Sequence, residues 1–209
     1  MAQPRFRRRK EDRPAEITDA AFRVFAKKGY AAARVAEVAE HAGVSKGLLY
    51  LYFKTKEELF KAVIKSVVMR RVDRLANIVE TTELSSTAFL RGPMADFMKS
   101  IPGSRVAVVI RLLLAEAPRH PDLVDYYWQN VVSRGLNAMT RLVERGVERG
   151  EFRPTALADV PQLLLAPMML ATLWNLLFTR RPLDTDRLID THIDMLLVYL
   201  TPPGGSENA

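Results

Sequence analysis

Residues 35–53 read VAEVAEHAGVSKGLLYLYF, and the local signals in this stretch define two short helices around a tight turn. Apolar residues recur at i, i+3, i+4 and i+7 from Val35 to Ala42, which places them on one helical face. Gly43 follows, where a helix commonly ends on a left-handed residue. Ser45 can cap the second helix, because its hydroxyl can accept a backbone N–H from the first turn. The stretch therefore predicts a helix-turn-helix.

The second of these helices has a face suited to DNA, which we call the reading face: Lys46, Gly47 and Tyr50. Lys46 and Tyr50 are four residues apart and share one side of the helix, and Gly47 allows the backbone to approach a surface closely. Leu49 lies on the other side and is expected to pack inward. A basic residue, a glycine and a phenol suit phosphate oxygens and base edges. From this stretch alone, an ordinary two-helix corner in an enzyme remains an alternative interpretation.

The distribution of charge favours nucleic acid as the partner. The chain has 209 residues and a formal net charge of +7. Residues 1–56 hold 13 Lys or Arg against 6 Asp or Glu, whereas residues 57–209 hold 18 of each. A charge run usually only solvates a surface. Here the whole excess surrounds the helix-turn-helix, and a basic face is the electrostatic footprint of nucleic-acid binding.

The N-terminal segment is expected to be a basic arm. Residues 1–13 carry six basic side chains without apolar periodicity. We interpret them as a mobile arm that could reach a DNA groove, with a disordered, solubilising tail as the alternative. Pro14 suits the first turn of a helix. Apolar residues at helical spacing run from Ile17 to Phe25, and Gly29 ends that helix.

Across residues 14–60 the ordered motif resembles the DNA-binding domain of the tetracycline-repressor (TetR) family. The residues that carry the resemblance are Ile17, Ala20, Ala21, Phe25, Gly29, Tyr30, Val38, Ala39, Ala42, Gly43, Val44, Ser45, Lys46, Gly47, Leu49, Tyr50, Tyr52, Phe53, Lys56, Glu57 and Leu59. The resemblance implies that the reading face meets the major groove. It also implies that Tyr52 and Lys56, together with the Ser45 cap, meet phosphates.

The sequence departs from the family pattern in three places. Ala33 and Arg34 stand where the family favours a Thr or Ser cap, and the charge of Arg34 could replace a phosphate contact. Leu48 stands where Thr is common, and Leu51 where His or Tyr is common. The DNA-contacting residues expected from the resemblance are Arg34, Ser45, Lys46, Gly47, Leu48, Tyr50, Tyr52 and Lys56.

Beyond the motif the sequence shows only helical patterning. Apolar spacing predicts helices over 55–79, 87–101 with a disturbance at Gly92-Pro93, 105–117, 121–149, 158–179 and 184–200. The predicted fold is all-α. A three-helix DNA-binding domain (14–56) joins a larger helical ligand-binding and dimerisation domain (57–201), followed by a flexible tail (202–209).

The most apolar segment predicts a homodimer. Residues 163–178 are apolar on nearly every side, but they are too short and too interrupted to span a membrane. Such a helix must be buried on nearly every side, and in a small protein a partner subunit can cover it. The last helix, 184–200, carries a leucine-rich stripe. By resemblance, the family builds a four-helix dimer interface from its last two long helices.

A mostly apolar ligand pocket is expected from aromatic and thioether side chains in residues 57–179. Pro167 removes an amide donor and frees the carbonyl of Leu163, and Asn175 adds an amide, so polar groups could orient a small apolar or aromatic effector. Arg111 could pair with an acid. Simple filling of the core is the alternative. The predicted ligand-binding residues are Phe97, Arg111, Tyr127, Trp128, Met168, Met169, Trp174, Asn175 and Phe178, with Tyr126 as a further aromatic neighbour.

Enzymatic chemistry finds little support. The chain has no cysteine, which excludes thiolate metal sites, and His192 lies two residues from Asp190 and from Asp194, so a helix points it away from both. No nucleophile elbow, phosphate loop or zinc spacing appears. No catalytic residue, metal or cofactor is therefore predicted.

The sequence predicts a cytoplasmic, ligand-released repressor that binds an inverted-repeat DNA operator as a homodimer. No secretory signal begins the chain, and no membrane association is expected. A ligand-independent architectural DNA-binding protein is the alternative, and a helical enzyme is a distant third.

Overall fold

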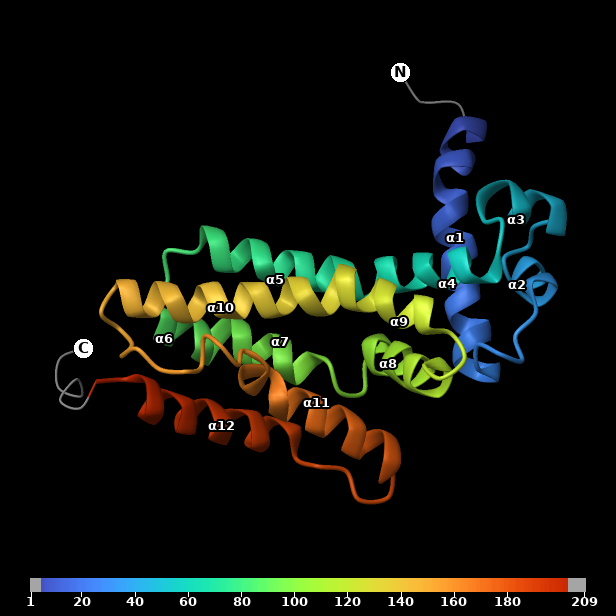
Figure 1. The fold of residues 1–209 in the computed structure, drawn as a ribbon. Coiled ribbons are helices and arrows are strands. Elements are labelled where there is room, and N and C mark those ends of the chain that lie inside the picture. The colour runs from blue at the N-terminus through green and yellow to red at the C-terminus, as the bar shows by residue number, and fades with distance from the viewer. Residues whose placement is uncertain (1–4, 203–209) are drawn as a thin grey trace. The chain divides into compact units, whose positions relative to one another are not determined.

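The computed structural model describes the backbone of residues 5–202 and side chains from residue 12 onward. Every regular element in this part of the chain is helical (Figure 1), which confirms the all-α prediction. The elements are α1 (Arg5–Lys28), α2 (Val35–His41), α3 (Lys46–Tyr52), α4 (Lys56–Ile64), η1 (Lys65–Met69), α5 (Arg70–Thr81), α6 (Ser86–Phe89), η2 (Leu90–Met94), α7 (Ala95–Ser100), α8 (Arg105–Glu116), α9 (Pro121–Tyr127), η3 (Trp128–Val132), α10 (Ser133–Glu148), α11 (Gln162–Leu177) and α12 (Thr185–Leu200). The three η segments are π-helical turns.

The first helix starts earlier than predicted. α1 begins at Arg5, so the expectation that Pro14 opens it is wrong, and Pro14 lies inside the helix. Pro14 has no amide to donate, but its carbonyl accepts from Thr18 Oγ1 at 2.7 Å. Residues 1–4 of the predicted basic arm lie outside the described residues, as do the side chains of 5–11.

The chain divides into two compact units that differ from the predicted domains. The first unit takes the described residues through Arg70 together with Val108–Tyr127. The second takes Arg71–Ala107 together with the described residues from Trp128. The helix-turn-helix thus belongs to a unit that includes α4, α9 and most of α8, rather than to residues 14–56 alone.

An aromatic cluster explains why α4 belongs to the first unit. The rings of Phe25, Tyr30 and Phe60 have centroids 5.1 to 5.6 Å apart, and all three residues are buried. Because Phe60 comes from α4, this helix completes the core on which α1 packs. Such aromatic pairs add stabilisation beyond the area that they bury.

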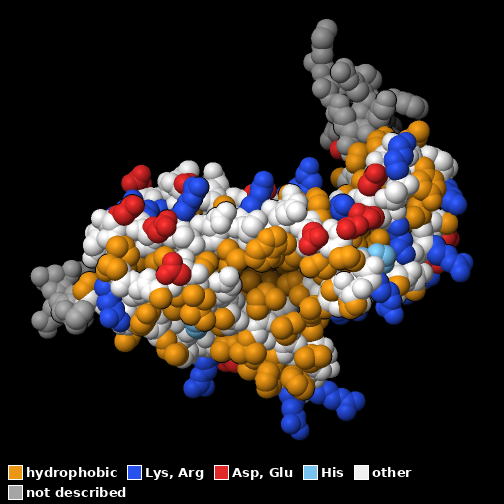
Figure 2. Space-filling view, in the orientation of Figure 1, with side chains coloured by type: hydrophobic (Ala, Val, Ile, Leu, Met, Phe, Trp, Pro, Cys, Tyr) orange, Lys and Arg blue, Asp and Glu red, His pale blue; other side chains and the backbone are white. Residues whose placement is uncertain are grey.

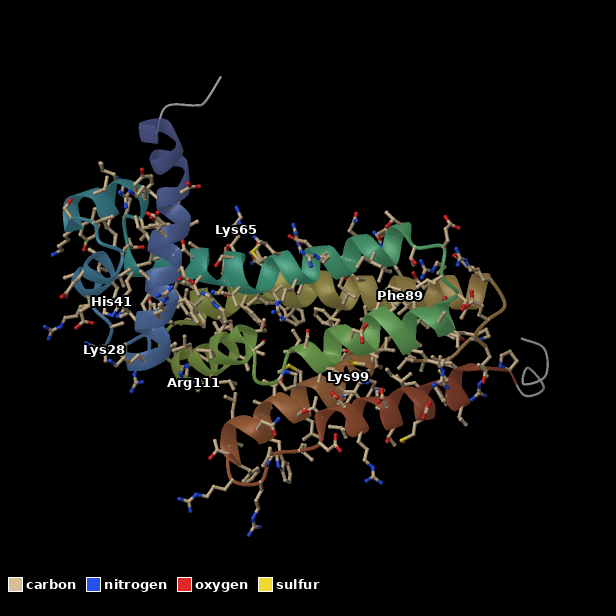
Figure 3. The ribbon with its side chains drawn as sticks, turned by 180° about the vertical axis from the view of Figure 1, so that it is seen from behind. Lys28, His41, Lys65, Phe89, Lys99 and Arg111 are labelled. Carbon is tan, nitrogen blue, oxygen red and sulfur yellow. The ribbon has the colours of Figure 1, made fainter. Side chains whose placement is uncertain are left out.

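In the second unit, α11 and α12 pack side by side, and α12 also packs on α7. Lys99 of α7, labelled in Figure 3, pairs with Asp190 of α12 at 2.6 Å. α11 begins at Gln162, not at residue 158 as predicted, because a proline disfavours helical backbone in the residue before it and Pro161 stands at the start. The predicted disturbance at Gly92-Pro93 is confirmed, since these residues lie within η2. In residues 5–202, no helix is both long and apolar enough to cross a membrane.

Of the predicted C-terminal tail, 202–209, only residue 202 is described; residues 203–209 lie outside the described part of the chain.

Candidate DNA-binding site

The turn and cap of the helix-turn-helix have the predicted geometry. Gly43 adopts φ +62°, the left-handed conformation that glycine allows without strain. Its amide donates to Glu40 O and the next amide, from Val44, donates to Ala39 O, which closes α2. Ser45 Oγ accepts from the amide of Leu48 at 3.1 Å and caps α3. Short-range hydrogen bonds therefore help to set the path from α2 into α3.

The reading face is exposed, as predicted, and the opposite side of α3 is buried. Lys46, Gly47 and Tyr50 are exposed, whereas Leu49 is 1% exposed. The ammonium of Lys46 lies 5.8 Å from the centroid of the Tyr50 ring. At this distance the ring attracts the cation, which holds both side chains over the same side of the helix.

Leu51 belongs to the same exposed surface, although the sequence-based set of DNA contacts omits it. Its side chain is 71% exposed, more than any other large apolar side chain described in the first unit. The signal that could have found it is spacing: Leu51 lies two residues after the inward-facing Leu49, on nearly the opposite side of a helix. Leu48 and Tyr52 of the expected set are both partly buried.

Lys56 is held inside the first unit, which differs from the expected phosphate contact. Its ammonium donates to the carbonyls of Ala31 at 2.9 Å and Ala33 at 3.0 Å and lies 4.6 Å from the centroid of the Tyr30 ring. Burial lowers the pKa of Lys56, against an opposing effect from the charge of Glu116. Two of its three N–H groups are thus committed to the turn between α1 and α2.

Glu116 of α8 holds that same turn from another direction. Its side chain is buried, and Oε1 accepts from the amide of Ala31 at 3.1 Å. The other oxygen, Oε2, has no hydrogen-bond partner in the described part of the chain and lies 3.8 Å from His120 Nε2. Burial, and next the charges of Glu57 and Glu116, raise the pKa of Tyr30 beside it. Residues from α4 and α8 together fix the turn that leads into α2.

Arg34 lies exposed at the N-cap of α2. Its amide donates to Glu37 Oε2 at 3.3 Å, and Lys28 Nζ donates to Glu37 Oε1 at 2.7 Å. The Lys28 bond is the main reason why the pKa of Glu37 is lowered, and the backbone bond from Arg34 adds to it. The negative charge of Glu37 thereby sits in the first turn of α2, where the helix dipole favours it.

The predicted ligand-binding residues do not form one group. Arg111, labelled in Figure 3, and Tyr127 belong to the first unit. Arg111 Nη2 donates to Ala26 O at 2.8 Å, so the guanidinium anchors α1 rather than standing free for an acid. Burial raises the pKa of Tyr127 to about 12.

The other seven lie in the second unit with different degrees of burial. Met168 is buried and Phe97 and Asn175 are partly buried, whereas the rest are exposed: Trp128 53%, Phe178 47%, Met169 37% and Trp174 37%.

Polar atoms of Trp174 and Asn175, two of the predicted ligand-binding residues, hold the chain between α11 and α12. Trp174 Nε1 donates to Arg181 O at 2.8 Å, and Asn175 Oδ1 accepts from Leu183 N at 2.9 Å. The rings of Trp174 and Phe178 lie with centroids 4.7 Å apart. The side-chain amide of Asn175 therefore stabilises this turn, and its oxygen already accepts a hydrogen bond from the backbone.

The carbonyl freed by Pro167 also has a partner within the second unit. Pro167 cannot donate to Leu163 O, and the backbone of Leu163 instead forms a hydrogen bond with His192 of α12. The other imidazole nitrogen, Nε2, is buried without a hydrogen-bond partner in the described residues. His192 thus ties α12 to the proline position of α11, a structural role that its spacing from Asp190 and Asp194 already favoured.

An apolar groove of about 280 Å³ lies beside this bond. Its lining includes none of the nine predicted ligand-binding residues: it consists of Ala156, Leu157, Val160, Leu163, His192, Met195, Leu196 and Tyr199. Their exposed members continue the apolar surface of α11 and α12.

Comparison with known proteins agrees with this architecture. The family model described as "Bacterial regulatory proteins, tetR family" matches residues 17–63. A second model, "Tetracyclin repressor-like, C-terminal domain", matches residues 88–196. These two matches cover both the helix-turn-helix and the larger helical part.

Individual relatives extend the match along the chain. The "Probable HTH-type transcriptional regulator ArpR" of Pseudomonas putida is 30% identical over 87% of this chain and 90% of its own. The "Fatty acid metabolism regulator protein" of Bacillus subtilis is 27% identical over 69% of this chain and 74% of its own. The solved structure of the transcriptional regulator FadR from Bacillus subtilis, in complex with stearoyl-CoA, superposes with a TM-score of 0.73 at 21% identity, covering 88% of this chain and 97% of that one. The chain belongs to the TetR family of bacterial transcriptional regulators.

Proposed function

We propose that this regulator is a repressor that binds an inverted-repeat operator as a homodimer and is released by a small ligand. The observation that carries DNA recognition is the exposed reading face on a helix whose other side is buried and whose start is capped by Ser45. A helix presented in this way can enter the major groove, where each base pair has its own pattern of donors and acceptors.

An uncovered apolar surface on the last two helices supports the homodimer. Leu170 and Leu177 of α11 are 49% and 74% exposed, and Met195 and Val198 of α12 are 66% and 81% exposed. Figure 2 shows hydrophobic side chains gathered over α11 and α12. Apolar patches of this kind mark interaction sites, and a second copy offers an identical apolar patch. Two subunits related by a two-fold axis would present two reading helices, which fits an inverted repeat.

A mostly apolar effector is supported by the methionines of the second unit. Met94, Met98 and Met139 are buried there, and methionine adapts its shape to irregular apolar ligands. The solved FadR structure is a complex of a protein of this fold with stearoyl-CoA. An effector of this type would release DNA by binding better to a conformation whose two reading helices do not fit the operator.

The decisive experiment starts from DNA fragments that the purified protein selects from a random pool. On the selected operator, Lys46→Ala and Tyr50→Ala should each weaken binding by about 1–3 kcal/mol for every base edge that the side chain reads. Lys65→Ala serves as the matched control, because Lys65 is an exposed lysine of the same unit on η1 (Figure 3). Fluorescence anisotropy of labelled DNA measures the affinities. Equal affinity of all three variants and the unmodified protein would refute the assigned reading face.

The ligand part of the proposal has a separate test. A panel of acyl thioesters, fatty acids and aromatic compounds is titrated into the protein–operator complex, and release of the labelled DNA is recorded. Release by at least one compound, with a matching shift in tryptophan fluorescence or melting temperature, supports a ligand-released repressor. Operator binding that no compound changes would favour the ligand-independent architectural protein.

A further inference from the structure

Leu51 is an apolar residue on a surface otherwise suited to a polar partner. Successive residues of an α-helix are rotated by about 100°, so Lys46, Tyr50, Gly47 and Leu51 occupy one continuous arc of roughly 140° on α3. All four are exposed, and Leu51 is the most apolar of them at 71% exposure. Folding of the first unit therefore does not use this side chain, and its environment is set by whatever meets the reading face.

Gly47 leaves space beside Leu51. In a helix a leucine side chain leans toward the N-terminus, over the residue four positions earlier, which here is Gly47. A Cβ placed at Gly47 would have no heavy atom within 4 Å in the described residues, so the space above it is open. The leucine methyl groups therefore border a bare stretch of backbone at the end of α3 that carries Lys46.

Among the exposed groups of the DNA major groove, one is apolar: the C5-methyl group of thymine. Leucine has no hydrogen-bond donor, so Leu51 cannot donate to a phosphate oxygen. The neighbouring charge of Lys46 and the net +7 charge, confined to residues 1–56, direct this surface to a polyanion. The partner that matches both the positive charge and the apolar side chain of Leu51 is duplex DNA that contains thymine.

We propose that Leu51 determines operator specificity by packing against the C5-methyl group of a thymine in each half-site, beside the open backbone of Gly47. This inference rests on the proposed DNA-binding function and adds one base identity to it. The reading helix then combines a polar contribution from Lys46 and Tyr50 with an apolar one from Leu51.

The test removes the methyl group from DNA and the leucine from protein in a double-mutant cycle. Each thymine of the selected operator is replaced in turn by deoxyuridine, which lacks only the C5-methyl group. Affinities are measured for the unmodified protein, for Leu51→Ala and for Leu48→Ala, the competing leucine of the same helix. Leu84→Ala is the control, because Leu84 is an exposed leucine of the second unit. Circular dichroism checks that all variants remain folded.

At one thymine position per half-site, removal of the methyl group should weaken binding by the unmodified protein about fourfold, the effect expected for roughly one buried methyl group. The same replacement should leave the affinity of Leu51→Ala unchanged, while Leu48→Ala and Leu84→Ala keep the fourfold dependence. The coupling between the two changes then assigns the contact to Leu51.

The inference is overturned if operator binding is intact but no thymine shows this coupling, if the coupling belongs to Leu48, or if the selected half-site contains no thymine. The proposed function survives each of these results. A protein that selects no DNA sequence at all overturns both the proposed function and the role of Leu51.

Discussion

The exposed face of α3 and the exposed face of α11 and α12 are both uncovered, yet they are built differently. The first mixes Lys46, Tyr50 and Leu51 on a helix capped by a neighbouring residue. The second presents Leu177, Val198 and other large apolar side chains on two helices packed side by side. A surface of the first kind suits a charged partner that binds reversibly. Burial of the second surface in a lasting interface is more favourable, because it removes large apolar side chains from water.

The two surfaces are positioned by interactions of different range. The reading face is positioned by hydrogen bonds between residues three to five apart, as in the Ser45 cap and the Gly43 turn. The α11–α12 surface involves contacts between helices, such as the hydrogen bond between His192 of α12 and the backbone of Leu163 in α11. Mutations should therefore separate DNA reading from assembly and from local stability.

The largest effect is expected for charges placed in the α11–α12 surface. Leu170→Arg and Val198→Glu should each convert dimers into monomers, because a charge buried at the interface would lack a partner. Removal of the second reading helix should weaken operator binding by about 100-fold or more. Light scattering gives the mass and anisotropy the affinity, with Leu84→Arg as the exposed-leucine control. Variants that stay dimeric would place the interface elsewhere.

A smaller effect, on the stability of the fold, is expected for a substitution of Gly146 in α10. A Cβ there would lie 2.1 Å from the ring of Phe152, which is buried at 2% exposure and whose amide bonds to the Gly146 carbonyl. Gly146→Ala should destabilise the protein by about 1–3 kcal/mol, because the ring must move within a packed core.

The matched control for that prediction is Gly135→Ala in the same helix. Its Cβ would meet Val72 at 3.9 Å, an ordinary contact, and alanine should stabilise the helix by about 0.5–1 kcal/mol. Urea unfolding of both variants measures the difference. Similar stability of the two would mean that the Phe152 ring adapts freely, contrary to tight packing around Gly146.

A still smaller effect is expected at the caps of the first unit. Ser45→Ala should cost about 1 kcal/mol, since the amide of Leu48 would have no acceptor, and Thr55→Ala should cost about as much through Glu58. Operator affinity should fall more for Ser45→Ala, because this cap starts the reading helix. Ser45→Asn, an equally good cap, should restore stability in thermal unfolding. No rescue by asparagine would indicate that Ser45 acts through something other than its capping bond.

The smallest expected effect is a pH dependence from His192. Burial lowers its pKa in the folded protein, and the bond to Leu163 opposes this only in part. The unfolded chain therefore takes up the proton first, so stability falls as the pH drops through about 6.5, the ordinary histidine pKa, and continues to fall until the folded pKa is passed.

His192→Asn keeps a side-chain amide that can donate to Leu163 but does not titrate. Urea midpoints at pH 7.5 and 5.5 should differ less in this variant than in the unmodified protein. Glu37 does not disturb the comparison, because its pKa is lowered and the stability that it contributes is lost only at still lower pH. Identical pH dependence of the two proteins would remove His192 as its source.

The helix-turn-helix was predictable from the residues in order, because its signals are local. Gly43 meets the left-handed turn, Ser45 caps α3, and Leu49 faces inward, each within a few residues of the turn or cap that positions it. The all-α architecture and the π-helical interruption near Pro93 followed in the same way from periodicity and from the missing amide of proline.

The hydrogen-bond partners of other side chains lie far away in the sequence, so no rule based on local spacing could predict them. Lys56 turns to carbonyls 25 and 23 residues away instead of remaining free, and Glu116 binds an amide 85 residues away. The nine residues predicted to form a pocket belong to two different units. Two of them, Trp174 and Asn175, use their side-chain polar atoms in hydrogen bonds to the turn between α11 and α12. Residue type specifies what a side chain can bond to, but the partner is chosen by the packing of distant segments, because a buried polar group must satisfy its hydrogen bonds where the fold places it.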